Sequence, residues 1–438
     1  MNVVLLSTYD LGHQPFGLAS PAAWLGARGH EVTLADLAVQ DMPAGAIRDA
    51  DVVCFYLPMH TAARLASNVI SKTRSLNAKA KLIAYGLYAS PNAEYLRDLG
   101  VGTVLSGEYE RSLCDAVEGC APAQIVSMER LTFLTPERAQ LPGLERYSKL
   151  RIDGEARLAG YTEASRGCKH LCRHCPIVPV YQGAFRVVQQ DVVLSDIHAQ
   201  VAAGARHITF GDPDFFNGPA HAMRIVRGMA HEFPGVTYDV TIKIEHILQH
   251  REYLRDLRAT GCAFLTSAVE SIDNDILEKL DKGHTRDHFF TAFRLCRDAS
   301  LPLLPTFVPF TPWTTPAGYR ELLRVIVECD LVDHVAPIQL ALRLLIPPDS
   351  RLLELDDIRE AITHFDRAAL LHRWSHRDPA MDELAASVLR LVSREQKENR
   401  TRREIFRSIW ELVNERAPEN FDLLPRAAIP YMDEPWYC

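Results

Sequence analysis

Three cysteines, Cys168, Cys172 and Cys175, are the residues whose spacing most clearly indicates chemistry. They lie within residues 161–176 at the spacing C-x3-C-x2-C, and no fourth cysteine follows nearby. Closely spaced thiolates in a short loop converge on one centre, which suits a soft metal ion or an iron–sulfur cluster. Four-cysteine ferredoxin runs have a different spacing and a fourth ligand. We therefore expect a [4Fe-4S] cluster held by three thiolates, whose remaining iron is open and can bind a substrate.

The ring residue before the third cysteine completes a known pattern. His174 gives the run C-x3-C-x-aromatic-C, which resembles the signature of the radical S-adenosylmethionine (radical SAM) family. The resemblance implies a cluster whose open iron chelates the amino and carboxylate groups of SAM, with His174 close to the cofactors. It also implies a reductant such as flavodoxin or ferredoxin, which supplies the electron for carbon–sulfur cleavage. The alternative, from another functional class, is a non-catalytic zinc-binding or sensor protein that uses the three cysteines with His170 or His174.

The composition is that of a globular protein without a nucleic-acid or membrane surface. The 438 residues are 47% apolar and 24% charged, with a net charge of −8. This length suggests about two to three domains. The N-terminus has the pattern of a buried strand rather than of a signal peptide, and no apolar run is as long as a membrane helix. The other seven of the ten cysteines are scattered, which is typical of a reducing compartment. We therefore expect a cytoplasmic protein that acts on a small molecule.

Residues 1–122 alternate strand-like and helix-like segments. Short apolar runs occur at residues 3–7, 31–35, 51–56, 81–85 and 101–105. This alternation predicts a doubly wound, Rossmann-like parallel sheet. Ligands of such sheets bind at the carboxyl ends of the strands. Those ends are the loops at residues 8–16, 57–61, 86–92 and 106–109.

Residues 14–19, together with residues 24–25 and 29–32, resemble the first loop and helix of the cobalamin-binding domain that precedes many radical SAM domains, and residues 107–110 resemble its last loop. The D-x-H-x-x-G motif, whose histidine coordinates cobalt in one class of cobalamin proteins, is absent. Leu87 also stands where relatives often carry a second glycine. Two interpretations therefore stay open, a cobalamin-binding domain and a scaffold without a cofactor. The candidate cofactor-binding residues of this domain are His13, His60 and Gly86.

A connector at residues 123–155 leads to a second alternating domain at residues 156–350. Strand-like segments occur near residues 161–165, 207–210, 236–242, 263–270, 303–308 and 334–340. Six strand–helix units correspond to the partial (β/α)6 TIM-like barrel that the radical SAM resemblance implies. In such barrels, polar residues at the C-terminal ends of the strands face the ligand.

Two strand ends of this domain resemble SAM-binding segments of the family. Gly211, Asp212 and Asp214 occupy the place where relatives bind the amino group of SAM, although a strand-end aspartate can equally make a turn. Glu270 and Ser271 stand where relatives carry G-x-E-S, and the resemblance places them near the ribose or methionine part of SAM.

Three further charged residues at strand ends are candidates with a structural alternative. Lys243 and Glu245 could act in catalysis through SAM or substrate, or they could pair with each other. Arg343 could bind the SAM carboxylate through two hydrogen bonds, or it could form a structural ion pair.

Residues 351–438 predict a mostly helical extension with an extended tail. Apolar residues at helical spacing predict helices at residues 381–394 and 402–416. The aromatic, proline-rich residues 429–438 resemble the tail of a radical SAM subfamily that ends in Cys-Cys-Ala-Glu-Pro or Cys-selenocysteine-Ala-Glu-Pro. Cys438 is therefore a candidate catalytic residue. One hypothesis is that the natural chain continues past it with cysteine or selenocysteine, and the alternative is a simple chain end.

The expected function is reductive cleavage of SAM followed by transfer of a SAM-derived group to a small molecule. The group is 3-amino-3-carboxypropyl or methyl. One alternative is cobalamin-dependent methylation, which the N-terminal domain suggests. The other is hydrogen abstraction by a 5'-deoxyadenosyl radical. The sequence does not identify the acceptor.

Overall fold

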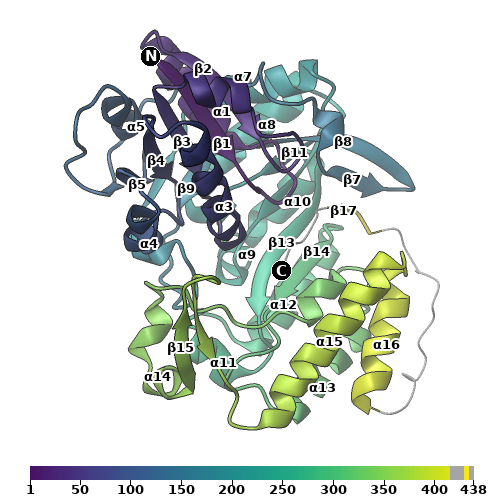
Figure 1. Ribbon diagram of the computed structural model, residues 1–438. Coiled ribbons are helices and arrows are strands. Elements are labelled where there is room, and N and C mark those ends of the chain that lie inside the picture. Colours follow the sequence, from purple (N-terminus) through teal and green to yellow (C-terminus); the bar gives the residue numbers. More distant parts are fainter. Residues whose placement is uncertain (415–428, 434–438) are drawn as a thin grey trace.

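The structure is a computed structural model that describes residues 1–414 and 429–433. An N-terminal α/β domain, a curved central sheet backed by helices and a C-terminal extension follow one another along the chain (Figure 1). Among the described residues, none of the helices is both long and apolar enough to cross a membrane.

The N-terminal domain is a parallel sheet with strand order β2-β1-β3-β4-β5-β6. Its strands are β1 (Asn2–Ser7), β2 (Glu31–Asp36), β3 (Val52–Tyr56), β4 (Lys81–Tyr85), β5 (Thr103–Gly107) and β6 (Val126–Ser127). The middle strands are almost continuously apolar because both of their faces are covered. The first five strands confirm the expected pattern, and β6 comes from the segment expected to be a connector.

Helices cover both faces of this sheet, so the expected doubly wound fold is confirmed. On one face, α1 (Phe16–Ala27) and α5 (Glu110–Val117) enclose a core with Leu5, Cys54 and Ile83. The other face carries α2 (Ala44–Asp49), α3 (His60–Leu76) and α4 (Ala93–Asp98). The 3-10 turn η1 (Ser90–Asn92) precedes α4.

The central sheet has the strand order β14-β13-β12-β11-β8-β7-β17. The strands are β7 (Lys149–Ile152), β8 (Glu155–Thr162), β11 (His207–Phe210), β12 (Thr237–Thr241), β13 (Cys262–Glu270), β14 (Leu303–Phe307) and β17 (Tyr431–Met432). From β8 to β14 all pairs are parallel, whereas β7 and β17 add antiparallel strands at one edge. The sheet curls into a half-barrel, as expected.

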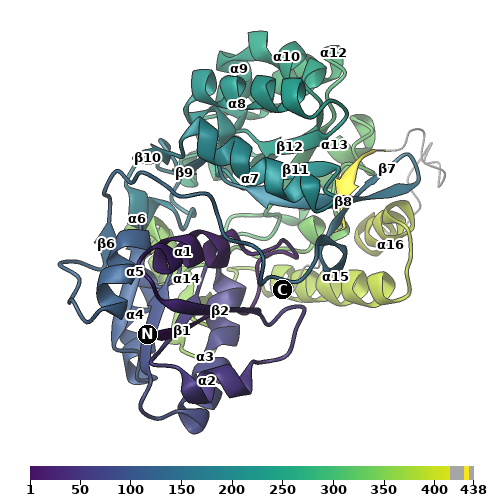
Figure 2. The same cartoon turned by 90° about the horizontal axis from the view of Figure 1, so that it is seen from above.

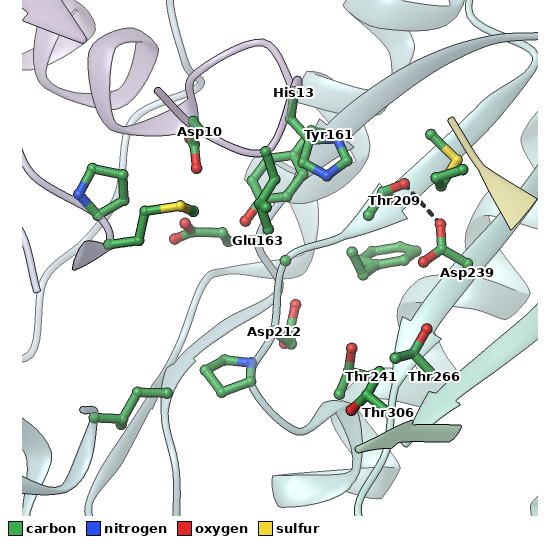
Figure 3. A pocket seen from close by; sticks show the side chains of 18 of the residues that line it. Asp10, His13, Tyr161, Glu163, Thr209, Asp212, Asp239, Thr241, Thr266 and Thr306 are labelled. Atoms are coloured by element: carbon green, nitrogen blue, oxygen red, sulfur yellow. Dashed lines mark hydrogen bonds between the residues drawn. The ribbon is translucent and has the colours of Figure 1, made fainter. Parts of the chain in front are cut away.

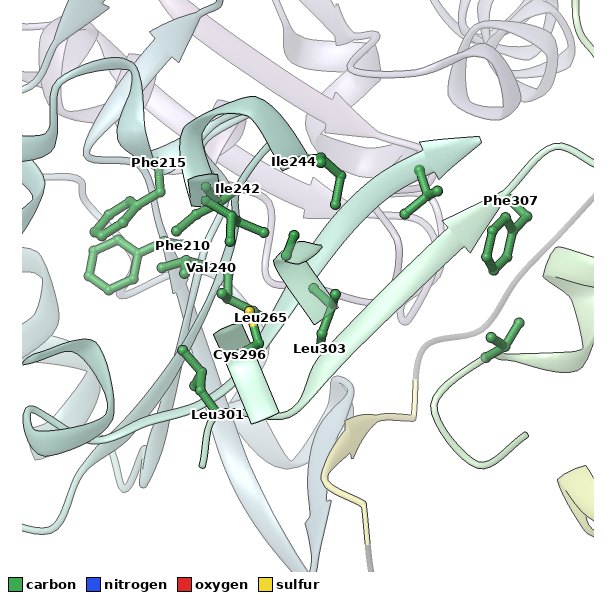
Figure 4. Close-up of a cluster of buried hydrophobic side chains, with 14 of the residues drawn as sticks. Phe210, Phe215, Val240, Ile242, Ile244, Leu265, Cys296, Leu301, Leu303 and Phe307 are labelled. Atoms are coloured by element: carbon green, nitrogen blue, oxygen red, sulfur yellow. The ribbon is translucent and has the colours of Figure 1, made fainter. Parts of the chain in front are cut away.

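Helices form the outer layer of the half-barrel (Figure 2). They are α7 (Gln190–Ala202), α8 (Pro219–Glu232), α9 (Ile244–Gln249), α10 (Leu254–Ala259), α11 (Asn274–Lys279), α12 (Arg286–Asp298) and α13 (Pro316–Glu328). Successive side chains of each strand point to opposite faces of the sheet, one towards the helices and the other towards the inside of the half-barrel. On β12, Val240 belongs to the apolar core drawn in Figure 4, whereas its neighbours Asp239 and Thr241 line a cavity.

The segment expected as the sixth barrel strand, residues 334–340, is not a strand. It forms a turn and the 3-10 helix η5 (Pro337–Leu340), so the expectation of six strand–helix units is wrong in this element. Pro337 explains the difference, because proline lacks the N–H that a ladder needs. After β14, an isolated parallel bridge pairs Phe310 with Arg343.

A small hairpin carries the cysteine loop. β9 (Ser165–Gly167) pairs with β10 (Phe185–Val187), and α6 (Val178–Tyr181) lies between them. Short 3-10 turns connect other elements, namely η2 (Leu144–Arg146), η3 (Phe215–Asn217), η4 (Arg251–Tyr253) and η6 (Arg351–Glu354).

The C-terminal extension contains both expected helices and one unexpected hairpin. The helices are α15 (Pro379–Lys397) and α16 (Arg402–Asn414), preceded by the short α14 (Asp356–Ala361). The hairpin is β15 (Ile362–Asp366) with β16 (Leu371–Trp374). β17 then returns to pair with β7 on the central sheet.

Candidate cofactor and substrate site

The cysteine loop follows β9 and places three free thiols close together. Cys172 is buried, and Cys168 and Cys175 are partly buried. Burial raises the pKa of the Cys175 thiol to about 12, and the neighbouring Cys172 and Cys168 add to this effect. Thiols in such surroundings become thiolates only beside a cation. Three convergent sulfur donors therefore fit the [4Fe-4S] cluster expected from the spacing.

Neighbouring segments fix the loop on both sides. The backbone N–H of Lys169 donates to Oδ1 of Asn217 at 3.1 Å, just after β11. On the other side, the N–H of Arg173 donates to the carbonyl of Leu280 at 2.9 Å. Gly167 makes the approach possible, because it has a φ of 74° and a Cβ there would lie 2.4 Å from the Tyr181 ring.

Glu270 meets His174 at the end of β13, a contact that the sequence did not indicate. Its Oε1 lies 3.1 Å from Nε2 of His174 and 3.4 Å from Nζ of Lys282. Burial alone would raise the pKa of the Glu270 carboxyl, but Lys282 and His174 outweigh burial and lower this pKa to about 2. A bulge in β13 and a φ of 66° at Glu270 turn the side chain towards the cysteine loop. The sequence did not indicate the contact of Lys282 with Glu270.

A cavity of about 490 Å³ lies between the N-terminal domain and the half-barrel (Figure 3). One wall is formed by the loops that follow β1, β3, β4 and β5, which are the loops expected to bind a ligand. The opposite wall is the inner face of β8 and β11–β14. Tyr431 and Met432 of β17 close part of the edge. The predicted residues that line this cavity are His13, Gly86, Gly211 and Asp212.

A row of threonines lines part of the barrel wall, among apolar side chains such as Phe210 and Phe264. Thr209, Thr241, Thr266 and Thr306 stand on four neighbouring strands, β11 to β14 (Figure 3). Asp239 joins them and accepts a hydrogen bond from the hydroxyl of Thr209 at 2.7 Å.

Carboxyl groups line the cavity where the two domains meet. Asp212 accepts hydrogen bonds from the Ser165 hydroxyl at 2.5 Å and from the Ala164 N–H at 2.9 Å. Burial nevertheless raises the pKa of Asp212 to about 7. Burial also raises the pKa of Asp10 to about 7, against the opposing effect of His13. These two carboxyl groups can therefore hold or release a proton near neutral pH.

Arg166 joins the two domains beside the cavity, a role that the sequence did not indicate. Its guanidinium donates to both carboxylate oxygens of Glu110, at 2.7 and 3.0 Å, and to Glu163 at 2.7 Å. The rings of Phe16, Tyr109 and Phe133 surround the cation, with centroids 5.5, 5.3 and 4.9 Å from Cζ. Burial and the neighbouring carboxylates raise the pKa of Glu108 to about 7, although Arg166 opposes this rise.

Some predicted residues lie outside the cavity. Asp214, Lys243 and Glu245 gather beside the cysteine loop, where Lys243 pairs with Glu245. Ser271 accepts a hydrogen bond from the N–H of Asp273 at 3.0 Å and so stabilises a turn. Cys438 lies outside the described residues.

Arg343 and His60 contact the C-terminal extension instead. Arg343 pairs with Asp382 at 2.8 Å and stacks on Trp374, which is the structural alternative considered for it. His60 lies at the start of α3, and its Nε2 is 2.6 Å from the carbonyl oxygen of Ala369. These placements give neither residue a contact with the cavity.

Residues 162–322 match the Radical SAM superfamily. The hopanoid C-3 methylase of Methylococcus capsulatus is 25% identical over 321 residues, which cover 68% of this chain and 62% of that enzyme. The bacteriochlorophyllide d C-12(1)-methyltransferase of Chlorobaculum tepidum is 30% identical over 126 residues, 28% of this chain and 27% of that enzyme. The chain thus spans less than two thirds of the length of either relative.

Solved structures show the same arrangement of domains. The cobalamin-dependent S-adenosylmethionine radical enzyme OxsB, with aqua-cobalamin bound, superposes with a TM-score of 0.69 at 15% identity, over 88% of this chain and 66% of that one. The radical S-adenosylmethionine methyltransferase TsrM from Kitasatospora setae gives a TM-score of 0.58 at 17% identity, over 75% and 73% of the two chains. Residues 162–322 of this chain are therefore a radical SAM domain, and the chain shares its fold with cobalamin-dependent radical SAM enzymes.

Proposed function

We propose that the protein is a cobalamin-dependent radical SAM methylase that acts on a polar small molecule. The observation that carries the proposal is the cavity shared by the two domains. Strand-end loops of the N-terminal domain form one wall and the inner face of the half-barrel forms the other. A group held by the first domain would therefore face a substrate held by the second. The names of the two relatives, a methylase and a methyltransferase, agree with methyl transfer.

The cysteine loop would bind the iron–sulfur cluster, and residues of the cavity wall would bind SAM. Cys168, Cys172 and Cys175 would hold the cluster, and the contact between His174 and Glu270 fixes the loop against β13. Gly211 and Asp212 line the cavity at the end of β11 and are the proposed contacts of SAM on that wall. When bound, the cluster with SAM would supply radical chemistry and cobalamin would supply the methyl group.

The cavity lining supports a polar substrate. Threonine hydroxyls on β11 to β14 can donate and accept hydrogen bonds, and carboxyl groups from both domains surround them. A substrate with hydroxyl or amino groups could form further hydrogen bonds with these threonines and carboxyl groups, and its apolar part could pack on Phe210 and Phe264 of the same wall.

Binding of hydroxocobalamin tests the first part of the proposal without knowledge of the substrate. The anaerobically reconstituted protein should bind about one equivalent in equilibrium dialysis. Leu87→Trp should weaken this binding at least about tenfold, because Leu87 lines the N-terminal wall. The matched control is Leu65→Trp on the exposed surface of α3, which should bind like the wild type. If the wild type binds no cobalamin, or if both variants bind equally well, the proposal is wrong.

The products of SAM then distinguish the reaction types. S-adenosylhomocysteine that forms only with cobalamin supports methylation. 5'-Methylthioadenosine would instead indicate transfer of the 3-amino-3-carboxypropyl group. 5'-Deoxyadenosine that forms equally with and without cobalamin would indicate hydrogen abstraction alone.

A further inference from the structure

Three side chains from separate segments converge beside the cysteine loop. His170 belongs to that loop, Asp214 follows β11 and His246 lies in α9. One ligand atom of each lies within 4.8 Å of the other two. Oδ2 of Asp214 is 2.7 Å from Nδ1 of His246 and 3.5 Å from Nε2 of His170. The three atoms therefore surround one point.

The three converging atoms are buried and lack hydrogen bonds. Oδ2 of Asp214, Nδ1 of His246 and Nε2 of His170 form no hydrogen bond of good geometry with a described residue, although the two histidine nitrogens lie 2.7 and 3.5 Å from Oδ2. Asp214 and His246 are buried, at 1% and 7% exposure. Buried polar atoms without hydrogen bonds are rare, and a bound ion is one way in which a protein satisfies them.

The remaining polar atoms of the cluster are engaged and orient it. Nδ1 of His170 lies 3.3 Å from Oε2 of Glu245, so a carboxylate supports the far side of this imidazole. Oδ1 of Asp214 accepts a hydrogen bond from the N–H of Phe216 at 3.2 Å, which leaves Oδ2 facing the histidines. A carboxylate behind a ligating histidine is the usual outer partner of a metal site.

We propose that His170, Asp214 and His246 bind a divalent metal ion of the zinc type, separate from the iron–sulfur cluster. Two imidazoles and one carboxylate suit zinc, with water as the fourth ligand. The same donor set also suits ferrous iron, which is the natural competitor. Lys243 neutralises Glu245, so Asp214 supplies the charge that attracts the cation. The partly exposed His170 side chain, at 18%, gives the ion a route from solvent.

The ion would tie the cysteine loop to the end of β11 and to α9. The cysteine loop and the segment after β11 are also joined by the hydrogen bond from the N–H of Lys169 to Asn217. The proposal does not depend on the reaction proposed above, because it concerns only the chain's own ligands.

Metal analysis of the holoprotein tests the proposal. After anaerobic reconstitution with iron and sulfide, incubation with zinc and extensive dialysis, the protein should contain about one zinc in addition to about four iron per chain. Asp214→Asn and His246→Gln should lose the zinc and keep the iron. The control is His250→Gln. The ring of His250 has its centroid 5.7 Å from that of His246, but His250 is not one of the three proposed metal ligands. Glu245→Gln should weaken zinc binding by about 10–100-fold.

A second measurement excludes the cysteines as the zinc ligands. In a variant with Cys168, Cys172 and Cys175 all changed to alanine, cobalt should give visible bands without sulfur charge transfer, and zinc should abolish them. Absence of these bands in a variant with normal circular dichroism would refute the proposal. Zinc that remains in the holoprotein of Asp214→Asn and His246→Gln would refute it as well, and this measurement decides the matter if the triple variant does not fold.

Discussion

Replacing Arg166 with methionine should loosen the junction between the two domains. The change keeps the length of the aliphatic stem and removes the cation that Glu110 and Glu163 share. Breaking a buried ion pair by removing one partner costs about 3–5 kcal/mol, because the other charge stays buried. For 438 residues the entropy of unfolding is about 0.9 kcal/mol/K, so the melting temperature should fall by about 3–5 °C.

The control for this prediction is a surface pair of the same residue types. Arg111 and Glu129 form an exposed ion pair, with side-chain exposures of 47% and 41%. Such pairs contribute about 0–1 kcal/mol, so Arg111→Met should lower the melting temperature by no more than about 1 °C. Differential scanning fluorimetry of the cluster-free proteins, prepared in parallel, gives both values.

The pH dependence of the Arg166 variant supplies the stronger test. Burial already raises the pKa of the Glu163 carboxyl, and Arg166 opposes this rise, so removal of the cation should raise this pKa further above its unfolded value. The stability associated with such a raised pKa is present at low pH and is lost as the pH rises. The deficit of Arg166→Met should therefore be larger at pH 8 than at pH 5, and Glu163→Gln in the same chain should reduce it. A deficit that does not depend on pH, or that Glu163→Gln leaves unchanged, would refute the reasoning.

Three other changes test the site directly. Cys172→Ala should lower the iron content of the reconstituted protein from about four per chain to about one or less, whereas the exposed Cys120→Ala should keep it. The melting temperature of Asp10→Asn should rise relative to that of the wild type between pH 5 and pH 8. Burial raises the pKa of Asp10 to about 7 in the folded state, so the folded wild type loses the stabilising protonated form over this pH range, whereas the asparagine variant has no proton to lose. Glu270→Gln should lower the melting temperature at pH 7, and the deficit should shrink as the pH falls from 4.5 towards 2, since Lys282 and His174 hold the pKa of Glu270 at about 2.

Features encoded in short stretches of sequence were predictable. The cysteine spacing identified the cluster loop, and apolar runs separated by polar loops identified the strands and therefore the loops that line the cavity. Glu270 was recognisable because a polar residue closes an apolar strand. Each of these depends on residues that are neighbours in the chain, for which periodicity is a direct physical signal.

Features that depend on distant residues were not predictable in this way. Arg166 and Glu110 are 56 positions apart and meet only when the two domains pack. His170, Asp214 and His246 come from three segments, and nothing in their local patterns indicates that they converge. Residues 334–340 misled the prediction because apolar content outweighed the signal of Pro337.

The pairing of β17 with β7 sets an order of events during synthesis. Asp433 accepts a hydrogen bond from the N–H of Lys149, 284 positions earlier in the chain. At about 5–20 residues per second, the ribosome needs roughly 15–60 s to make the intervening chain. During that time β7 is an unprotected edge strand, which favours association with other chains. Tyr431 and Met432 are also the last residues of the cavity lining to be synthesised, so the cavity acquires this wall only after β17 has paired with β7.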